Sequence, residues 1–362
     1  MKLDDVLSLQ IEKPSERIRA QAKDIWNHVA KPIDSLGLFE ELICRIAAVQ
    51  NRTDIQIDQK ALIIMCADNG VVFEGVSQCG QEVTEQVAAL MGKRKSSVGK
   101  LSAHYPVEIF TYDVGMNCSR VPEGVIDRKV CRGTQDFVKG PAMTDEQCLE
   151  AIRVGIEAVE ACAEKGMGLI ATGEMGIGNT TTSTALACAI LGMLPRECTG
   201  RGAGLTDEGL GKKIRVIEEG LSLHLGEQMG KGLTAAGDVF EALRRLGGAD
   251  IAGLCGVFIG GAMYRIPIVI DGLISAVAAL AADRLVPGCR DYMIASHRGK
   301  EKAMARLLEE LSLSAVIRAD MALGEGTGAV MLFPLLDMAR CLYADGTSFQ
   351  SASIKQYERL TP

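Results

Sequence analysis

The stretch MGLIATGEMGIGNTT, residues 167–181, joins a short apolar run to a glycine-rich turn and a threonine-rich segment. An apolar run of this length between glycines is typical of a buried strand. Asn179 and Thr180 are suited to begin a helix, because their side chains accept hydrogen bonds from its free backbone N–H groups. The stretch therefore predicts a strand, a turn and a helix, which is the repeating unit of a parallel α/β sheet.

Four other short apolar runs end in polar residues in the same way, and helical patterns separate them. They are ALIIMCADNG (61–70), VEIFTYDVGMN (107–117), IPIVIDG (266–272) and YMIASHRG (292–299), with Asp68, Asp113, Asp271, Ser296 and His297 at their ends. In open parallel sheets, ligands bind beyond the carboxyl ends of the strands. We therefore expect these polar residues to gather at one site, although βα loops need polar turn residues in any case.

Both ends of the chain have helical periodicity. SERIRAQAKDIWNHVA (15–30) and GLFEELICRIAAVQ (37–50) precede the predicted strands, and LLDMARCLYAD (335–345) follows them. We expect an α/β domain over residues 59–333 and a small helical lobe built from residues 1–58 and 334–362.

The composition excludes several classes of protein. The 362 residues include 39 basic and 46 acidic side chains, a net charge of −7, and only 4% aromatics, so a nucleic-acid partner is not expected. The N-terminus MKLDDVLSLQIEKPSERIRAQ has no apolar signal segment. The most apolar region, residues 251–280, is broken by Arg265, Pro267 and Asp271, so no membrane span is expected. We predict a cytoplasmic protein.

Twelve cysteines occur without any CxxC pair. Zinc sites need short paired spacings, so reduced, buried thiols are the better interpretation and no metal is expected. Of the four histidines, His28, His104 and His224 lie in helix-like or linker context, whereas His297 ends a predicted strand. His297 is either structural or part of a site.

Two glycine-rich segments, GEMGIGNTTTSTALACAI (173–190) and TGRGAGLTDEGLGKKI (199–214), each lead into a helix. Backbone N–H groups at a helix N-terminus bind phosphate, and Lys212 and Lys213 add positive charge. Neither segment is a Walker loop or a GxGxxG motif. Each alone could be an ordinary capped turn, but the two together favour a sugar-phosphate site.

Two further segments have the character of a binding site. ADNGVVFEGVSQCGQEVTEQV (67–87) mixes apolar and polar residues, which suits either a flat organic ligand or a surface loop. LGEGTGAV (323–330) sets Glu325 among three glycines. A carboxylate there could cap a helix, bind a metal or take a proton from a substrate.

Together these segments resemble the nicotinate-nucleotide:dimethylbenzimidazole phosphoribosyltransferase family. The resemblance covers about Lys31 to Val330. Its motifs are KPIDSLGLFEEL (31–42), ADNGVVFEGVS (67–77), DVGMN (113–117), RGTQDFVKGPAMT (132–144), GEMGIGNTTTSTA (173–185), GRGAGLTDEGL (200–210), IPIVIDGLISAVAAL (266–280) and LGEGTGAV (323–330).

The resemblance implies a Rossmann-like parallel sheet with helices on both faces, a small lobe formed by both termini, and a dimer. The family moves the phosphoribosyl group of nicotinate mononucleotide to a nitrogen of a benzimidazole, giving the α-ribazole phosphate of cobamides, without a cofactor. The pyridinium leaves without a general acid, so a single base that deprotonates the acceptor suffices.

The family's site residues transfer to this chain by motif. Glu325 corresponds to the catalytic base, and Glu174 lies in the substrate loop. Gly176, Gly178, Asn179, Thr180, Gly202 and Lys213 correspond to the ribose-phosphate side. Ser77, Cys79 and Gln86 belong to the wall of the acceptor pocket, and we also expect Ser296, at its strand end, to contact substrate.

The acceptor loop departs from the family pattern. Asn69 stands where histidine is common, Gly80 where proline is common, and Cys79 where a small hydroxyl residue can occur. The acceptor is therefore either a benzimidazole or a phenol. Phenol-activating relatives are heterodimers in which one subunit keeps the glutamate, so the partner is either a second copy or a paralogue. A non-catalytic sugar-phosphate-binding subunit is the rival interpretation, and Glu325 and both phosphate loops argue against it.

Overall fold

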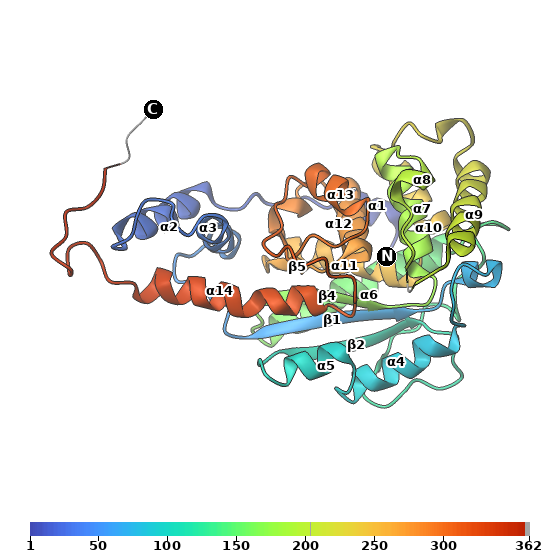
Figure 1. The fold of residues 1–362 in the computed structure, drawn as a ribbon, viewed down its shortest axis with the longest axis horizontal. Coiled ribbons are helices and arrows are strands. Elements are labelled where there is room, and N and C mark those ends of the chain that lie inside the picture. The colour runs from blue at the N-terminus through green and yellow to red at the C-terminus, as the bar shows by residue number, and fades with distance from the viewer. Residues whose placement is uncertain (203, 359–362) are drawn as a thin grey trace.

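The computed structural model describes residues 1–202 and 204–358. In these residues, one parallel sheet contains six strands in the order β3-β2-β1-β4-β5-β6 (Figure 1). The strands are β1 (Lys60–Ala67), β2 (Glu108–Gly115), β3 (Ile126–Asp127), β4 (Leu169–Met175), β5 (Ile268–Ile270) and β6 (Met293–Ala295). The chain leaves β1 toward β2 on one side and later returns to β4 on the other. This reversal beside β1 is where an open parallel sheet binds its ligand.

The sequence of β1 explains its central place. All eight of its residues are buried, and its side chains alternate between two cores. Ile63 and Met65 belong to one core, and Leu62 and Ile64 to the other. An apolar run without polar alternation is what a strand covered on both faces requires. The predicted α/β class and parallel sheet are confirmed.

Helices cover both faces of the sheet (Figure 1). One core includes residues of α6 (Asp145–Glu164), α7 (Asn179–Leu191), α9 (Asp207–Leu225), α10 (Ala236–Leu246), α11 (Ala249–Met263), α12 (Leu273–Leu285) and α13 (Met304–Glu310). The other includes residues of α2 (Glu16–His28), α3 (Leu38–Gln50), α4 (Glu82–Gly92), α5 (Ser97–Ser102) and α14 (Thr327–Asp345). The short elements are α1 (Leu3–Leu7), α8 (Pro195–Cys198), η1 (Gly70–Glu74), η2 (Gly226–Gln228) and η3 (Cys289–Tyr292).

Helix α2 and the segment that follows α14 meet at the far end of α14, whereas the N-terminus itself lies near α10 and α11 (Figure 1). The rings of Trp26 and Tyr343 lie 5.3 Å apart. Val29 forms a β-bridge with Ser348, and the Phe349 N–H donates to the His28 carbonyl. The predicted division at 58/59 and 333/334 stays a prediction, and its second boundary falls inside α14.

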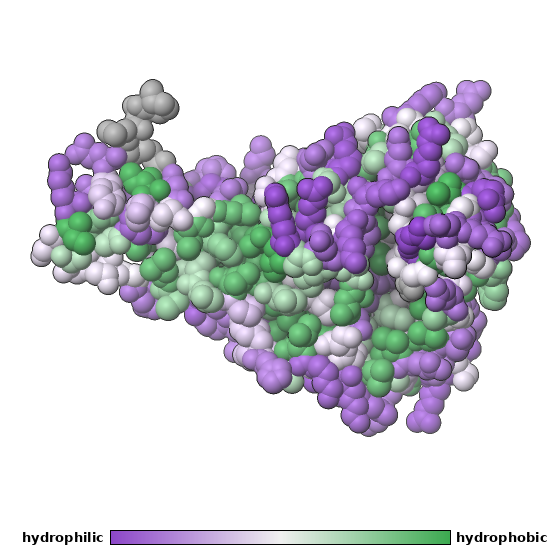
Figure 2. Space-filling view, in the orientation of Figure 1, coloured by the Kyte–Doolittle hydropathy of each residue, from purple (hydrophilic) through white to green (hydrophobic). Residues whose placement is uncertain are grey.

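Among the helices of the described residues, α14 is long and apolar enough to cross a membrane, but half of its apolar window is buried inside the molecule. Such burial is common in core helices. Its outer face leaves Met331, Met338 and Leu342 exposed, and hydrophobic surface extends along this side of the molecule (Figure 2).

Candidate active site

A cavity of about 580 Å³ lies at the carboxyl ends of the central strands. The loops after β1, β4, β5 and β6 contribute to its wall, together with α9 and the segment before α14. The cavity therefore lies where the strand order reverses, as expected for a ligand site in this fold.

Glu325 reaches the cavity from an unusual backbone turn. Gly324, Glu325 and Gly326 have φ angles of 86°, 62° and 84°, so three successive residues are left-handed. A glutamate in that region is held there by its surroundings. Asp271 stabilises this turn, because its carboxylate accepts hydrogen bonds from the N–H groups of Gly326 at 3.1 Å and Gly328 at 2.8 Å.

The carboxylate of Glu325 lines the cavity and is half-buried. Its Oε2 accepts the N–H of Val98, at the start of α5, at 3.0 Å. A second carboxylate, that of Glu174 at the end of β4, lines the same cavity. Burial is the largest cause that raises the pKa of Glu174, to about 7, and the charge of Glu325 adds to it. The two carboxylates thus face the same cavity, where a negative charge is poorly solvated.

Glu174 belongs to a buried chain of polar groups. The Asn179 amide donates to Oε2 of Glu174 and, at 3.1 Å, to Oδ2 of Asp250. Asp250 is fully buried, and burial followed by the nearby Glu174 raises its pKa to about 7. Burial also raises the pKa of Asp271 to about 7, against the effect of its backbone hydrogen bonds. Burial thus raises the pKa of two carboxyl groups in the cavity wall, Glu174 and Asp271, and of Asp250 behind it.

A positively charged group, in contrast to these carboxyl groups, lies at Lys213. This side chain is 1% exposed, and its Nζ donates to the Thr180 hydroxyl at 2.9 Å. A Cβ on Gly202 would lie 3.1 Å from that hydroxyl and 3.5 Å from the Lys213 Nζ. Burial lowers the pKa of Lys213 to about 8. The two predicted phosphate loops thus join a lysine, a hydroxyl and a helix start, which suits a phosphate group.

The cavity brings together most of the predicted site residues. Its lining includes Glu325, Glu174, Gly176, Gly178, Asn179, Thr180, Gly202, Lys213 and Ser77. The predicted acceptor and phosphate loops also contact each other, since Gln78 Nε2 donates to the Gly204 carbonyl.

Three predicted residues do not line the cavity. Cys79 and Gln86 are exposed outside it. Ser296 is fully buried, and its hydroxyl donates to the Ile270 carbonyl at 2.6 Å, so it joins β6 to β5. The departures at Asn69 and Gly80 also lie outside the lining.

His297, which the sequence left as either structural or part of a site, lines the cavity, and burial lowers its pKa. The sequence analysis missed other lining residues, including Lys300 and Glu301 from the loop after β6. The apolar part of the wall includes Val76, Val87, Met175, Ile177, Leu273, Ile274 and Leu323. Asp250, which contacts the lining residue Asn179 but does not line the cavity itself, gave no sequence signal because it lies in an otherwise apolar helix. In the described residues, no group of three or more His, Cys, Asp or Glu could hold a metal.

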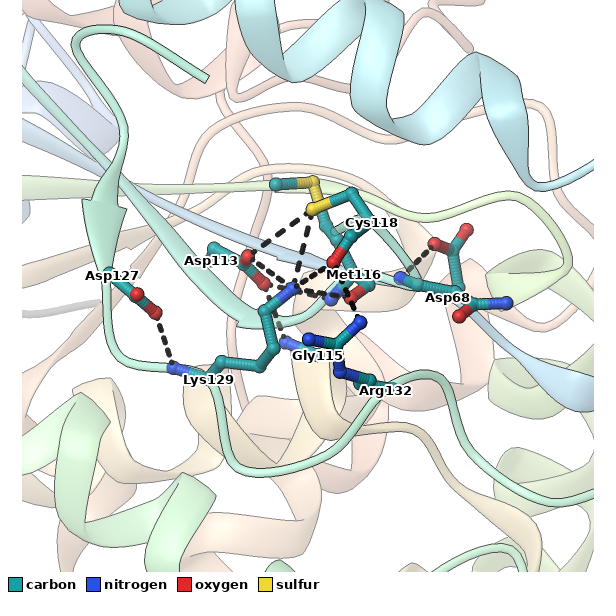
Figure 3. Close-up of polar contacts among 9 residues, drawn as sticks. Asp68, Asp113, Gly115, Met116, Cys118, Asp127, Lys129 and Arg132 are labelled. Carbon is teal, nitrogen blue, oxygen red and sulfur yellow. Dashed lines mark hydrogen bonds and ion pairs between the residues drawn. The ribbon is translucent and has the colours of Figure 1, made fainter. Parts of the chain in front are cut away.

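The ends of β1 and β2 form a separate polar cluster (Figure 3). The Asp113 carboxylate accepts the N–H groups of Gly115 at 3.0 Å and Met116 at 2.8 Å, and it pairs with Lys129 at 2.9 Å. Asp68 accepts the N–H of Asn117 at 2.7 Å. None of these residues lines the cavity. The expectation that the polar residues of all five strand ends gather at one site was therefore wrong for Asp68 and Asp113, although the loop after β1 lines the cavity through Val76, Ser77 and Gln78.

Comparisons with known proteins agree with this geometry. A family model described as Phosphoribosyltransferase matches residues 11–354. The nicotinate-nucleotide–dimethylbenzimidazole phosphoribosyltransferase of Acetivibrio thermocellus is 41% identical over 330 residues, 91% of this chain and 92% of the relative. The enzyme of the same name from Clostridium acetobutylicum is 39% identical over 344 residues, 95% of this chain and 96% of the relative.

A solved structure gives the same result. The crystal structure of CobT from Thermus thermophilus superposes with a TM-score of 0.86 at 34% identity, covering 94% of this chain and 100% of that one. The fold, the cavity and the similarity over nearly the whole length agree, and this chain is a member of the phosphoribosyltransferase family that contains these proteins.

Proposed function

We propose that this protein transfers the 5-phosphoribosyl group of nicotinate mononucleotide to a nitrogen of a dimethylbenzimidazole-type base, giving α-ribazole phosphate and nicotinate for cobamide synthesis. One observation carries the proposal. A single cavity contains both a carboxylate that can act as a base, on Glu325, and the lysine and hydroxyl cluster of Lys213 and Thr180.

The cationic cluster accounts for the donor. Its 5′-phosphate binds Lys213, Thr180 and the backbone at Gly176, Gly178 and Gly202, where glycine lets the chain approach the phosphate closely. A charge-assisted hydrogen bond from a buried lysine is stronger than a neutral one. Glu174 and Asn179 line the wall between this cluster and Glu325.

The step itself needs one base. The acceptor nitrogen attacks C1′ of the ribose, the bond from C1′ to the pyridinium nitrogen breaks, and its electron pair neutralises the ring. The acceptor's N–H proton passes to Glu325. The apolar side chains of Val76, Val87 and Leu323 supply contact area for a flat aromatic acceptor.

The test is an incubation of the pure protein with nicotinate mononucleotide and a panel of benzimidazoles and phenols, followed by mass measurement of the products. We expect nicotinate and a benzimidazole riboside phosphate in equal amounts. Release of nicotinate without transfer, or no consumption of the donor by any acceptor, would overturn the proposal. Products from phenols would extend the range of acceptors.

We further propose that the protein acts in the cytoplasm as a homodimer. The cysteines of the described residues are all free, which suits a reducing compartment. The exposed Met331, Met338 and Leu342 give α14 an apolar outer face that a second copy could cover. Light scattering on the pure protein tests this, and a monomeric mass at assay concentration would contradict it. Addition of paralogous chains would reveal a heterodimer.

A further inference from the structure

Four carboxylates of the described residues line the cavity: Glu174, Asp271, Glu301 and Glu325. Three of them accept hydrogen bonds, from Asn179, from backbone N–H groups before and in α14, and from Val98. The fourth, Glu301, accepts a hydrogen bond from its own backbone N–H, but its Oε2 atom is buried and has no hydrogen-bond partner. A buried acceptor without a partner destabilises the folded protein, so a ligand that donates to it recovers stability.

The loop after β6, which carries Glu301, adjoins the helix that leads to the phosphate loop. The Lys302 Nζ donates to the Arg196 carbonyl of α8 at 3.3 Å, and α8 leads directly to the phosphate loop at Gly200–Gly202. The charge of Glu301 also helps to raise the pKa of Glu174, so the two groups act on the same space. Gly299 gives the carboxylate room, because a Cβ there would lie 2.3 Å from Oε2.

The chemical groups of nicotinate mononucleotide show which of them can donate a hydrogen bond to Glu301. An ionised carboxylate only accepts hydrogen bonds. In nicotinate mononucleotide the phosphate and the nicotinate carboxylate are anions, and the hydrogen-bond donors are the 2′ and 3′ hydroxyls of the ribose. The terminal torsion of glutamate is broad, so either oxygen can turn toward such a pair of hydroxyls.

We propose that Glu301 binds the ribose hydroxyls of the donor and thereby positions the sugar between the phosphate cluster and Glu325. The inference deepens the proposed function and rests on it, because that function assigns the phosphoribosyl group to this cavity. Glu301 is then a substrate-binding residue that distinguishes ribose from deoxyribose.

The experiment compares the binding of ribose 5-phosphate and 2-deoxyribose 5-phosphate by calorimetry. We expect the wild type to bind ribose 5-phosphate about 10–100-fold more tightly, the effect of a hydrogen bond to a charged group. Glu301→Ala should reduce this preference to less than about threefold, and Glu301→Gln, which keeps a carbonyl acceptor, should retain an intermediate preference. Glu309→Gln, an exposed glutamate on α13, is the matched control and should behave as wild type.

Each outcome decides the matter. Equal binding of the two sugars by the wild type, or an unchanged preference in a folded Glu301→Ala variant, overturns the role of Glu301. If Glu301→Ala does not fold, the preference of Glu301→Gln decides in its place. A preference that depends on Glu301 in a protein that does not transfer from nicotinate mononucleotide would instead reject the proposed function and leave the sugar site standing.

Discussion

Two groups of buried carboxylates at strand ends meet opposite conditions in this molecule. At the end of β2, Asp113 is fully buried but has Lys129 and two backbone N–H groups as partners (Figure 3). At the end of β4, Glu174 is also buried but lies beside a cavity, with an amide as its side-chain partner and further carboxylates around it. Compensated charge fixes a loop, whereas uncompensated charge beside a cavity is typical of a reactive site.

The largest expected effect tests the cavity side of this comparison. Glu325→Gln keeps the shape of the side chain and can still accept the Val98 N–H, but it cannot take a proton. A general base contributes about 10²–10⁴-fold, or roughly 3–5 kcal/mol, so kcat should fall by that factor. The affinity for nicotinate mononucleotide should stay nearly constant, because the base acts on the acceptor.

The control for this variant is Asp320→Asn. Asp320 is an exposed carboxylate five residues earlier that does not line the cavity. Kinetic assays and melting curves on both variants separate chemistry from stability. A folded Glu325→Gln variant with kcat within about threefold of the wild type would show that Glu325 is a structural carboxylate, since loss of a base costs far more.

The second-largest expected effect tests the end of β2, where the buried charge has a partner. Lys129→Met removes the cation that pairs with the fully buried Asp113. Leaving a buried charge without its partner costs about 3 kcal/mol, to be measured as a loss in the free energy of unfolding in urea. The kcat of the folded variant should be unchanged, because the pair lies outside the cavity. A loss of kcat without a loss of stability would break the comparison, since it would place the β2 end in the active site.

A smaller effect is expected on the affinity for the donor, nicotinate mononucleotide. Lys213→Met keeps the buried aliphatic stem and removes the charge, so the affinity for nicotinate mononucleotide should fall by about 1.5–3 kcal/mol in calorimetry. The pKa of Lys213 is lowered to about 8, so wild-type affinity should also decline as the pH rises through 8. Neighbouring Lys212, which is exposed and outside the cavity lining, provides the control Lys212→Met. Equal affinities for the two variants would remove Lys213 from the phosphate site.

The sequence was sufficient for the sheet and for most of the site. Apolar runs ending in polar turns predicted the parallel strands, because strands buried on both faces leave no room for polar alternation. Glycine-rich loops before helices identified the phosphate side, because anion binding at helix starts is a local property of the chain. Glu325 was found through its glycine-rich surroundings and the family resemblance.

The remaining residues depend on tertiary structure. Asp68 and Asp113 end strands just as Glu174 does, but their partners are backbone N–H groups at residues 115–117 and Lys129, and they do not line the cavity. Asp250 lies in the apolar helix α11, and its contact with Asn179 joins residues far apart in the sequence. Glu301 is distinguished by a buried Oε2 atom without a partner beside the cavity, which periodicity cannot reveal.

The smallest expected effect tests the comparison of the two strand ends by the direction in which the stability cost of a substitution changes with pH. Burial raises the pKa of Asp250 from 3.8 to about 7, so the folded protein binds an extra proton between these two pH values. The stability that Asp250 contributes is therefore fully present below pH 3.8 and is lost as the pH rises through 7. Asp250→Asn removes this dependence, so its cost relative to wild type should shrink by about 1–2 kcal/mol between pH 5 and 8. Coupling to Glu174 spreads the titration over both groups and keeps the change small.

Urea unfolding of both proteins at pH 5 and pH 8 measures this difference. Hydrogen bonds that asparagine fails to reproduce cost the same at both pH values, so they cancel and only the proton-linked part remains. Lys129→Met tests the other strand end, where loss of the cation paired with the buried Asp113 should lower stability at both pH values. If the cost of Asp250→Asn grew with pH instead of shrinking, the ionised Asp250 carboxylate would be compensated in the folded protein as Asp113 is by Lys129, and the distinction between the two strand ends would fail.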